Sequence, residues 1–251
     1  MEVNDPEHVV ARFGGHIKGK LLICADEGSF ASEKSAGKLK NMITADLVTL
    51  EEKYQRPIAV INHMRLIITG NDLQIITASR DERRYCVLDV LPTHKDDTEY
   101  WKRMHEWRDN GGAEALHHYL LHYPLKDVDL RTVPKTKALT DQKIASMDDV
   151  ERWLLAVLNR GYIRQGPPWG SPVAVSTIRA SFAEFQGVKE MSALDARIGR
   201  KLSEVFPQFK KSRNRTAGGQ EYRYTFPPLA ECRQMFQEYI GGEIDWPAPQ
   251  W

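Results

Sequence analysis

The amino-acid sequence predicts an α/β unit over residues 1–126, a connector over residues 127–146 and a smaller unit over residues 147–251. In the first part, short apolar runs alternate with helical periodicity, which favours a sheet with parallel strands. The middle stretch is polar, contains Pro134 and has no clear period, as is common in a linker between domains. The last part carries helical patterns followed by one hairpin signal.

The composition is that of an ordinary globular protein. Its 251 residues, 41% of them hydrophobic and 27% charged, are enough for one large or two modest cores. The net charge of +1 means that any case for nucleic-acid binding rests on local patches. Three widely separated cysteines fit reduced thiols, and no apolar stretch approaches the roughly 20 residues that cross a bilayer. With no signal-peptide core either, we expect a soluble cytoplasmic protein.

The elements of the first part follow from local periodicity and turn signals. Ala36, Leu39 and Ile43 recur at helical spacing, and Gly111-Gly112 separates two further helical patterns. Strands are expected over residues 21–25, 46–52, 58–61, 65–71 and 85–90. Helices are expected over residues 33–43, 96–108 and 113–122.

Polar side chains follow two of the predicted strands. Asp26 and Glu27 end the first apolar run, and Asn71 ends the run that begins at Arg65. Nucleotide hydrolysis needs one acid to hold hydrated Mg²⁺ and a neighbouring acid to orient or deprotonate water. Taken singly, each site is also explained by a buried strand that runs out into a polar loop.

A pair of arginines follows in the same part of the chain. Arg83 and Arg84 lie in the cluster Ser79 to Tyr85, directly before the last predicted strand. Arginine neutralises the charge that develops on a transferring phosphoryl group. The simpler alternative is that both arginines pair with Asp81 and Glu82.

An acidic-ended strand, an amide-ended strand and paired arginines, in this order, resemble the Walker B, sensor 1 and arginine-finger motifs of superfamily 3 helicases. These are the AAA+ motors of phage and plasmid primase-helicases, and the resemblance covers roughly residues 8–146. It implies that Asp26 holds Mg²⁺ through water, Glu27 polarises the attacking water and Asn71 positions that water beside the γ-phosphate of ATP. It also implies that Arg83 or Arg84 reaches the nucleotide of a neighbouring subunit, in a ring that is a homo-hexamer.

One part of the family pattern is missing, because no convincing phosphate-binding loop is present. Residues 14–20 fit the spacing G-x-x-x-x-G-K, but such a loop follows a strand, opens a helix and ends in Ser or Thr. Here Leu21 follows, and the chain enters the Asp26-Glu27 strand directly. The first part is therefore expected to be a partial AAA+ domain of the P-loop NTPase type.

The predicted hairpin between the Walker B and sensor 1 strands carries Lys53, Tyr54 and Arg56 near its tip. In the resembled motors, a hairpin at this place projects a lysine into the central channel, where it grips single-stranded DNA. A cation for phosphate and an aromatic ring for a base suit that role. The alternative is an ordinary solvated hairpin tip.

The last part predicts helices over residues 147–159, 176–185 and 193–206, a hairpin over 209–226 and a closing helix over 229–239. Three helices followed by a basic hairpin resemble a winged helix, which implies contact with duplex DNA. The expected DNA-binding residues are Arg197, Arg200, Lys201, Lys210, Lys211, Arg213, Arg215 and Arg223. Basic residues on both helix and wing match a groove-and-backbone footprint, although short basic clusters are also common on solvated surfaces.

The histidines at 118 and 122 share one helical face, but no third ligand is near in sequence, so no metal beyond Mg²⁺ is expected. The resemblance implies that the chain is part of an ATP-dependent replicative DNA helicase, a primase-helicase of phage or plasmid type, with ATP and Mg²⁺ as cofactors of the intact protein. If a phage encodes it, we expect it in the cytoplasm of the bacterial host. The alternative is a catalytically inactive, truncated paralogue that acts as a DNA-binding or assembly protein.

Overall fold

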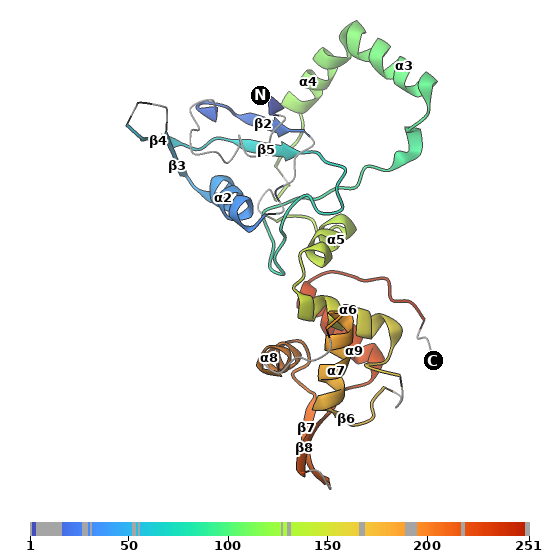
Figure 1. The fold of residues 1–251 in the computed structure, drawn as a ribbon. Helices are drawn as coiled ribbons and strands as arrows, with labels where there is room; N and C mark the ends of the chain where they lie inside the picture. Colours follow the sequence, from blue (N-terminus) through green and yellow to red (C-terminus); the bar gives the residue numbers. More distant parts are fainter. Residues whose placement is uncertain are drawn as a thin grey trace.

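The computed structural model describes residues 2–3, 17–26, 30, 32–51, 54, 56–126, 128–129, 132–165, 169–188, 195–216 and 219–248. The fold is mixed α/β (Figure 1). The residues described form two hydrophobic cores. Residues between 17 and 87, together with Leu139, form the first core. Residues between 147 and 240 form the second. We refer to the parts around these cores as the first and the second unit.

The sheet of the first unit is parallel, as the sequence predicts. It contains β1 (Glu2–Val3), β2 (Leu22–Ala25) and β5 (Arg65–Ile68), in the order β1-β2-β5. The pairing of β2 with β5 aligns Ala25 with Ile68, so these two strands end side by side. Helix α2 (Glu33–Thr44) lies beside the sheet and contributes the buried Leu39 to the same core (Figure 1).

The predicted hairpin between β2 and β5 is confirmed. Its strands are β3 (Leu47–Leu50) and β4 (Ile58–Ile61), which pair antiparallel. Tyr54 in the connecting loop has a φ of 67°, a left-handed conformation that is rare outside glycine.

The strand predicted over residues 85–90 does not form. Tyr85 is buried, but Leu88 is 72% exposed, and no described strand pairs with this segment. A strand needs an adjacent edge for its backbone hydrogen bonds. Among the described residues this segment has no such edge, so its apolar pattern alone does not make a strand.

The two helices predicted around Gly111-Gly112 are confirmed as α3 (Thr98–Trp107) and α4 (Ala113–Leu121). The segment η3 (Arg108–Gly112) joins them through a kink, in which Asn110 and Gly111 are not helical and Gly111 has a φ of 95°. These helices project away from the sheet (Figure 1). Neither α3 nor α4 has a buried residue.

The stretch predicted to be a connector without clear periodicity contains a largely buried helix, α5 (Lys137–Ala145). The side-chain oxygen of Gln142 accepts hydrogen bonds from the backbone N–H groups of Ile75 (2.8 Å) and Ile76 (3.1 Å). Its amide nitrogen donates to the carbonyl oxygen of Leu73 at 3.0 Å. Because α5 buries polar side chains that bind backbone groups, it lacks the apolar periodicity by which helices are recognised.

Lys143 and Arg80 join the two units. The ammonium of Lys143 donates to the carbonyl oxygens of Arg80 (2.8 Å), Ile240 (3.0 Å) and Gly241 (3.2 Å). Burial lowers the pKa of this lysine. The guanidinium of Arg80 pairs with Glu204 at 2.6 Å and lies 4.2 Å from the centre of the Tyr239 ring.

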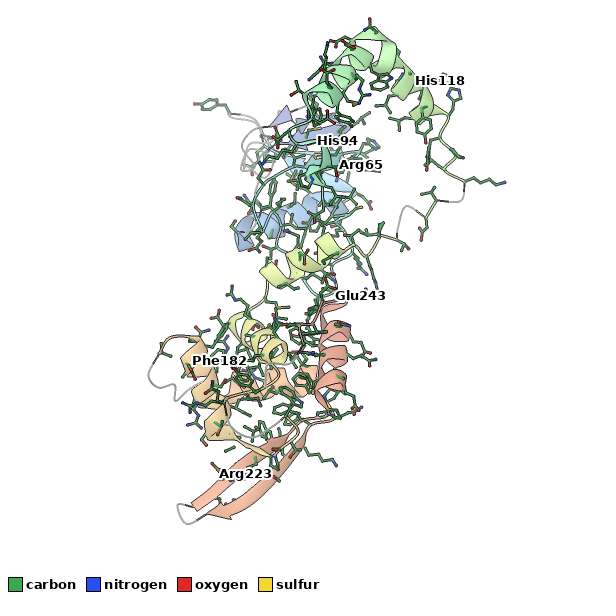
Figure 2. The ribbon with its side chains drawn as sticks, turned by 90° about the vertical axis from the view of Figure 1, so that its right-hand side faces the viewer. Arg65, His94, His118, Phe182, Arg223 and Glu243 are labelled. Carbon is green, nitrogen blue, oxygen red and sulfur yellow. The ribbon has the colours of Figure 1, made fainter. Side chains whose placement is uncertain are left out.

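The second unit has the predicted order of helices and hairpin. Its elements are α6 (Asp149–Arg160), β6 (Val173–Ala174), α7 (Val175–Phe185), α8 (Asp195–Val205), β7 (Lys210–Thr216), β8 (Gly219–Thr225) and α9 (Leu229–Ile240). A capping box of Asp148 and Glu151 begins α6. Trp153, Phe182 and Leu202 bring α6, α7 and α8 into one core, and Figure 2 labels Phe182 in it. The indole N–H of Trp153 donates to the Ser181 hydroxyl at 3.1 Å.

Candidate functional site

The carboxyl ends of β2 and β5 bring Asp26 and Thr69 into contact. The N–H of Thr69 donates to the carbonyl oxygen of Ala25 at 3.0 Å, which extends the strand pairing by one residue. The Thr69 hydroxyl then donates to the Asp26 carboxylate. The acidic strand end and the neighbouring strand end therefore form one polar site.

The other two residues predicted for this site are less closely defined. Asn71 is exposed and follows β5 by three positions, while Glu27 lies outside the described residues. Thr69 was not singled out from the sequence. The available signal was a hydroxyl residue directly after the apolar run that ends at Ile68.

The site offers oxygen donors of the kind that Mg²⁺ prefers. The Asp26 carboxylate and the Thr69 hydroxyl are both hard ligands, and Mg²⁺ is usually held by one or two carboxylates together with waters and substrate phosphates. In the described part of the chain, no three His, Cys, Asp or Glu residues gather closely enough to hold a metal by themselves. The two oxygen donors therefore suit a Mg²⁺ ion that waters and substrate phosphates also bind.

The near-match to a phosphate loop does not open a helix. Gly14 lies outside the described residues, but residues 17–20 form a turn in which Lys20 donates to the carbonyl oxygen of Ile17 at 3.1 Å. The chain then enters β2. A phosphate loop presents amides at the start of a helix, so this turn lacks that geometry.

Glu82 is the centre of the arginine cluster. Its buried carboxylate accepts the backbone N–H groups of Arg83 and Arg84, both at 3.0 Å, and pairs with Lys40 at 3.2 Å. Burial by itself would raise the pKa of Glu82, but these hydrogen bonds and the lysine charge outweigh it and lower the pKa. The carboxylate therefore fixes the backbone from which both arginines project.

The two arginines differ in what they touch. The Arg84 guanidinium lies 3.4 Å from Glu82 and its side chain is only 28% exposed. The alternative that an arginine pairs with its neighbouring acid is thus confirmed for Arg84. Arg83 is exposed, and its backbone N–H donates to the Glu82 carboxylate.

The β3–β4 loop is the place of the predicted channel residues. Tyr54 is 94% exposed and Arg56 is also exposed. Lys53 lies outside the described residues. The tip therefore presents an aromatic ring and a cation to solvent.

The β7–β8 hairpin divides its basic residues between two faces. Lys211 pairs across the strands with Tyr224, and Arg213 pairs with Tyr222. Side chains alternate along a strand, so these four residues share one side, which we call the wing face. The Lys211 ammonium lies 5.7 Å from the Tyr224 ring centre, and the Arg213 guanidinium lies 5.6 Å from that of Tyr222.

The opposite face of the hairpin is less basic than the sequence suggests. Lys210 and Arg223 lie there, and the Arg223 guanidinium pairs with Glu221 at 3.3 Å. Glu221 also accepts the Ser176 hydroxyl of α7 at 3.1 Å. Arg215 belongs to β7, and its side chain lies outside the described part of the structure.

Helix α8 lies beside the wing face. A Cβ atom on Gly199 would meet the Tyr224 hydroxyl at 3.9 Å. Arg197 and Arg200 of this helix are exposed, and Arg200 donates to the carbonyl oxygen of Ala196 at 3.1 Å. Basic residues of helix and wing therefore occur on neighbouring elements.

Lys201 is not part of that surface, which corrects its predicted placement. Its ammonium lies 2.8 Å from Glu151, 3.1 Å from Asp148 and 3.0 Å from the Tyr239 hydroxyl. The side chain is only 18% exposed. Burial by itself would lower the pKa of Lys201, but the hydrogen bonds to Glu151 and Tyr239 raise it. A helical position beside Arg200 gives no sign of this burial in the sequence.

Replacing Lys201 by alanine should lower the unfolding free energy of the second unit by about 1–3 kcal/mol, because two carboxylates lose their shared cation. The same change at exposed Arg200 is the matched control and should have little effect. Burial tends to raise the pKa of Asp148, but the N–H of Glu151 and the Lys201 ammonium lower it. The contribution of the Asp148 carboxylate to the unfolding free energy is present above the pKa that Asp148 has in the unfolded chain. It is lost as the pH falls through the lowered pKa of Asp148 in the folded protein. Thermal unfolding at neutral and acidic pH tests this, and equal losses for both variants would contradict it.

Comparisons with known proteins support the fold at low sequence identity. A family of unknown function, DUF5906, matches residues 1–84. The apo structure of the NrS-1 C-terminal region (305–718) has a TM-score of 0.63 and 14% identity, over 89% of this chain. An A-form apo structure of the same region has a TM-score of 0.62 and 13% identity, also over 89% of this chain.

The chain spans 59% of the length of both of those solved chains. A search of curated proteins found no match. Within the described residues, no helix is long and apolar enough to cross a membrane.

Proposed function

We propose that this chain is part of an ATP-dependent replicative DNA helicase of the phage or plasmid primase-helicase kind. It would supply the rear part of an AAA+ core and a winged-helix DNA-binding domain. The contact of Asp26 with Thr69, at the carboxyl ends of two parallel strands, carries the proposal. Ligands of open parallel sheets bind beyond these ends, and oxygen donors there suit a metal-bound phosphate.

Each residue of this site would have a separate role in ATP hydrolysis. Asp26 would hold Mg²⁺ through water, and Thr69 would orient the Asp26 carboxylate through its hydroxyl. Glu27 would accept a proton from the attacking water, which Asn71 would position. Bound Mg²⁺ would neutralise charge on the phosphates.

Arg83 is the better candidate for the arginine finger. A finger must extend from its own subunit toward a nucleotide held by the next one. Arg84 is held at Glu82, whereas Arg83 is exposed on a backbone that the same carboxylate fixes. We therefore assign the finger to Arg83 and a positioning role to Glu82.

The second unit would bind DNA through α8 and the wing face. Arg197 and Arg200 would meet the duplex from the helix, and Lys211 and Arg213 from the wing. The β3–β4 tip would contact single-stranded DNA in the channel of a homo-hexamer through Lys53, Tyr54 and Arg56. The second candidate function, a DNA-binding or assembly protein without turnover, is favoured by the turn at residues 17–20, which is not a phosphate loop.

The purified 251-residue chain should hydrolyse ATP negligibly. Without the amides and the lysine of a phosphate loop, the β- and γ-phosphates lack their main anchors. Steady-state phosphate release by this chain measures this. Turnover that Asp26→Ala abolishes would show that a phosphate-binding element is present within residues 1–251.

In the complete product of the gene, Glu27→Gln should stop hydrolysis but largely spare ATP binding, because the amide keeps the shape and loses the base. Asp46→Asn is the control, since Asp46 is an exposed carboxylate in the loop before β3. Full turnover by the Glu27→Gln protein would contradict the assignment of Glu27 as the base, whereas no turnover by the unaltered protein would favour the second candidate function.

A further inference from the structure

Aromatic side chains along β8 lead from the second core out to solvent. Phe226, directly after β8, is buried in that core. Tyr224 packs against the same core, and its ring centre lies 4.9 Å from that of Phe209. Tyr222 is the next residue outward on the wing face and is 53% exposed. Packing therefore explains Phe226 and Tyr224, but it does not explain an aromatic ring at position 222.

The surroundings of Tyr222 are cationic. The Arg213 guanidinium lies 5.6 Å from its ring centre, and Lys211 is on the same face of the hairpin. Glu221 lies on the opposite face, where it pairs with Arg223. The described residues of the wing face thus combine an exposed ring with two cations and include no acid.

The wing face meets α8 at Tyr224. A Cβ atom on Gly199 of α8 would lie 3.9 Å from the Tyr224 hydroxyl. Tyr222 is two residues nearer the tip, about 7 Å further along the strand. The hairpin projects from the helices of the second unit (Figure 1), and Arg197 and Arg200 of α8 are exposed. Tyr222 therefore lies outward of the helix–wing contact, beside the DNA that α8 would hold.

An exposed ring among cations suits unpaired bases better than a continuous duplex. Inside a duplex, neighbouring bases cover both faces of each base, so a ring stacks there only if base pairs are first unstacked. Single strands expose the faces of their bases, and proteins bind them with cations for the phosphates and aromatic rings for the bases. Contacts to the phosphates of a duplex require no ring.

We propose that the wing face binds the first unpaired base at a junction between duplex and single-stranded DNA. The Tyr222 ring stacks on this base, and Lys211 and Arg213 contact the phosphates beside it. The inference rests on the proposed function, because it takes DNA binding by α8 and the wing as its premise. It deepens that function by specifying a junction as the DNA that the second unit recognises.

The simpler explanation is that Tyr222 only stabilises the hairpin through its cross-strand neighbour Arg213. A ring with this role would affect the unfolding temperature and the binding of every DNA alike. A ring that stacks on an unpaired base would affect only DNA that contains such a base. The choice of DNA therefore separates the two roles.

The test measures fluorescence anisotropy of the 251-residue chain with a blunt duplex and with the same duplex carrying a tail of about four unpaired nucleotides. The tailed duplex should bind about 10-fold more tightly, as expected for one base stacked on an aromatic ring. Tyr222→Leu should remove this preference and change affinity for the blunt duplex less than about twofold. Tyr222→Phe should keep the preference, because the ring remains.

A fluorescent adenine analogue as the first unpaired base reports stacking at that position. Its emission should fall when the unaltered chain or the Tyr222→Phe protein binds, but not when the Tyr222→Leu protein binds. Tyr54→Leu is the matched control, since Tyr54 is also an exposed tyrosine of a hairpin but belongs to the first unit. This change should alter neither the preference nor the emission.

Three results would overturn the inference. Equal affinity for the two DNAs, or a preference that survives Tyr222→Leu, would do so while leaving duplex binding by the second unit intact. Equal losses for both DNAs in the Tyr222→Leu protein, with a lower unfolding temperature, would assign the ring to hairpin stability alone. A chain that binds neither DNA would contradict the proposed function of the second unit, and the inference with it.

Discussion

Replacing Arg83 by alanine in the complete product of the gene should lower ATP hydrolysis by about 10³-fold or more, the usual contribution of an arginine finger. Arg84→Ala should reduce hydrolysis much less and chiefly lower stability, because it removes a cation from the buried Glu82. Steady-state hydrolysis and thermal unfolding of both variants separate the two effects. Large and equal losses of hydrolysis would leave the assignment to Arg83 without support.

Mixed rings provide the sharper control. Under the proposed function, Glu27→Gln subunits would keep the finger and lose the base, whereas Arg83→Ala subunits would keep the base and lose the finger. Each variant should be inactive by itself, but mixing should restore activity at interfaces where each kind of subunit supplies its intact group. Mixtures as inactive as the separate variants would exclude an active site shared between subunits.

DNA binding by the chain should weaken steeply with salt. If roughly four cations of α8 and the wing face contact phosphates together, log affinity falls with log salt at a slope of about −3 to −4. Reversing both Lys211 and Arg213 to Glu should weaken binding to all sequences alike, because phosphate contacts carry no base information. Fluorescence anisotropy with labelled duplexes of different sequence, over a salt series, measures both effects.

Two adjacent lysines test which side of the hairpin meets DNA. Lys211→Glu changes the wing face, and Lys210→Glu makes the same charge change on the opposite face. The first should weaken binding more than the second. Equal effects would mean that the net charge of the hairpin, not the wing face, determines binding. If affinity responds neither to salt nor to reversal, the surface would be expected to face a protein.

The elements with strong local signals were predicted correctly from the sequence. The parallel strands β2 and β5, the antiparallel hairpin between them and the helices around Gly111 all have clear periodicity or turn residues. The proximity of Asp26 to the end of β5 also follows, because neighbouring parallel strands end at the same edge.

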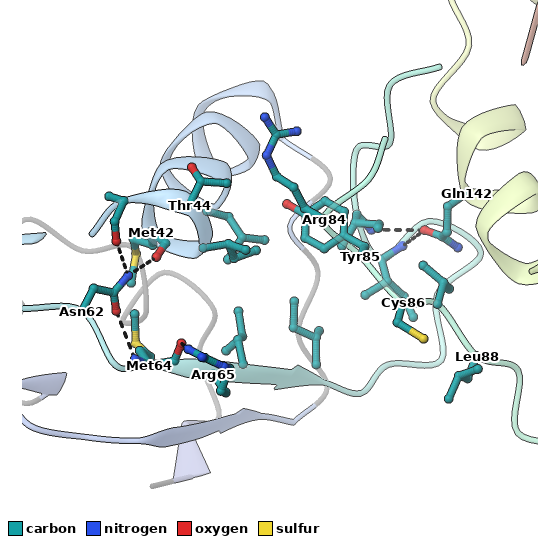
Figure 3. Close-up of a pocket in the computed structure, with 18 of the residues that line it drawn as sticks. Met42, Thr44, Asn62, Met64, Arg65, Arg84, Tyr85, Cys86, Leu88 and Gln142 are labelled. Carbon is teal, nitrogen blue, oxygen red and sulfur yellow. Dashed lines mark hydrogen bonds between the residues drawn. The ribbon is translucent and has the colours of Figure 1, made fainter. Parts of the chain in front are cut away.

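The failures come from interactions between distant residues. The segment that begins at Tyr85 has the residues of a strand, but pairing depends on an edge that local sequence does not encode. Helix α5 was missed because Gln142 (Figure 3) and Lys143 use their polar groups inside the protein. Lys201 looks like a surface cation beside Arg200, and only the packing of α6 and α9 against α8 gives it two carboxylates and a tyrosine. The difference between Arg83 and Arg84 likewise depends on which side chain reaches Glu82.

The contacts that Arg80 and Lys143 make between the two units determine how a force on one unit reaches the other. Domains that are joined by a flexible polar linker usually move relative to each other, so a force on one domain is transmitted only weakly to the other. Here the Lys143 ammonium donates to backbone carbonyls of both Arg80 and the end of α9. The guanidinium of Arg80 forms an ion pair with Glu204 of α8. The hairpin lies at the far end of the second unit (Figure 1), and Arg83 follows Arg80 by three positions. A force on the hairpin would therefore pass through the contacts of Lys143 and Arg80 to the segment that carries Arg83.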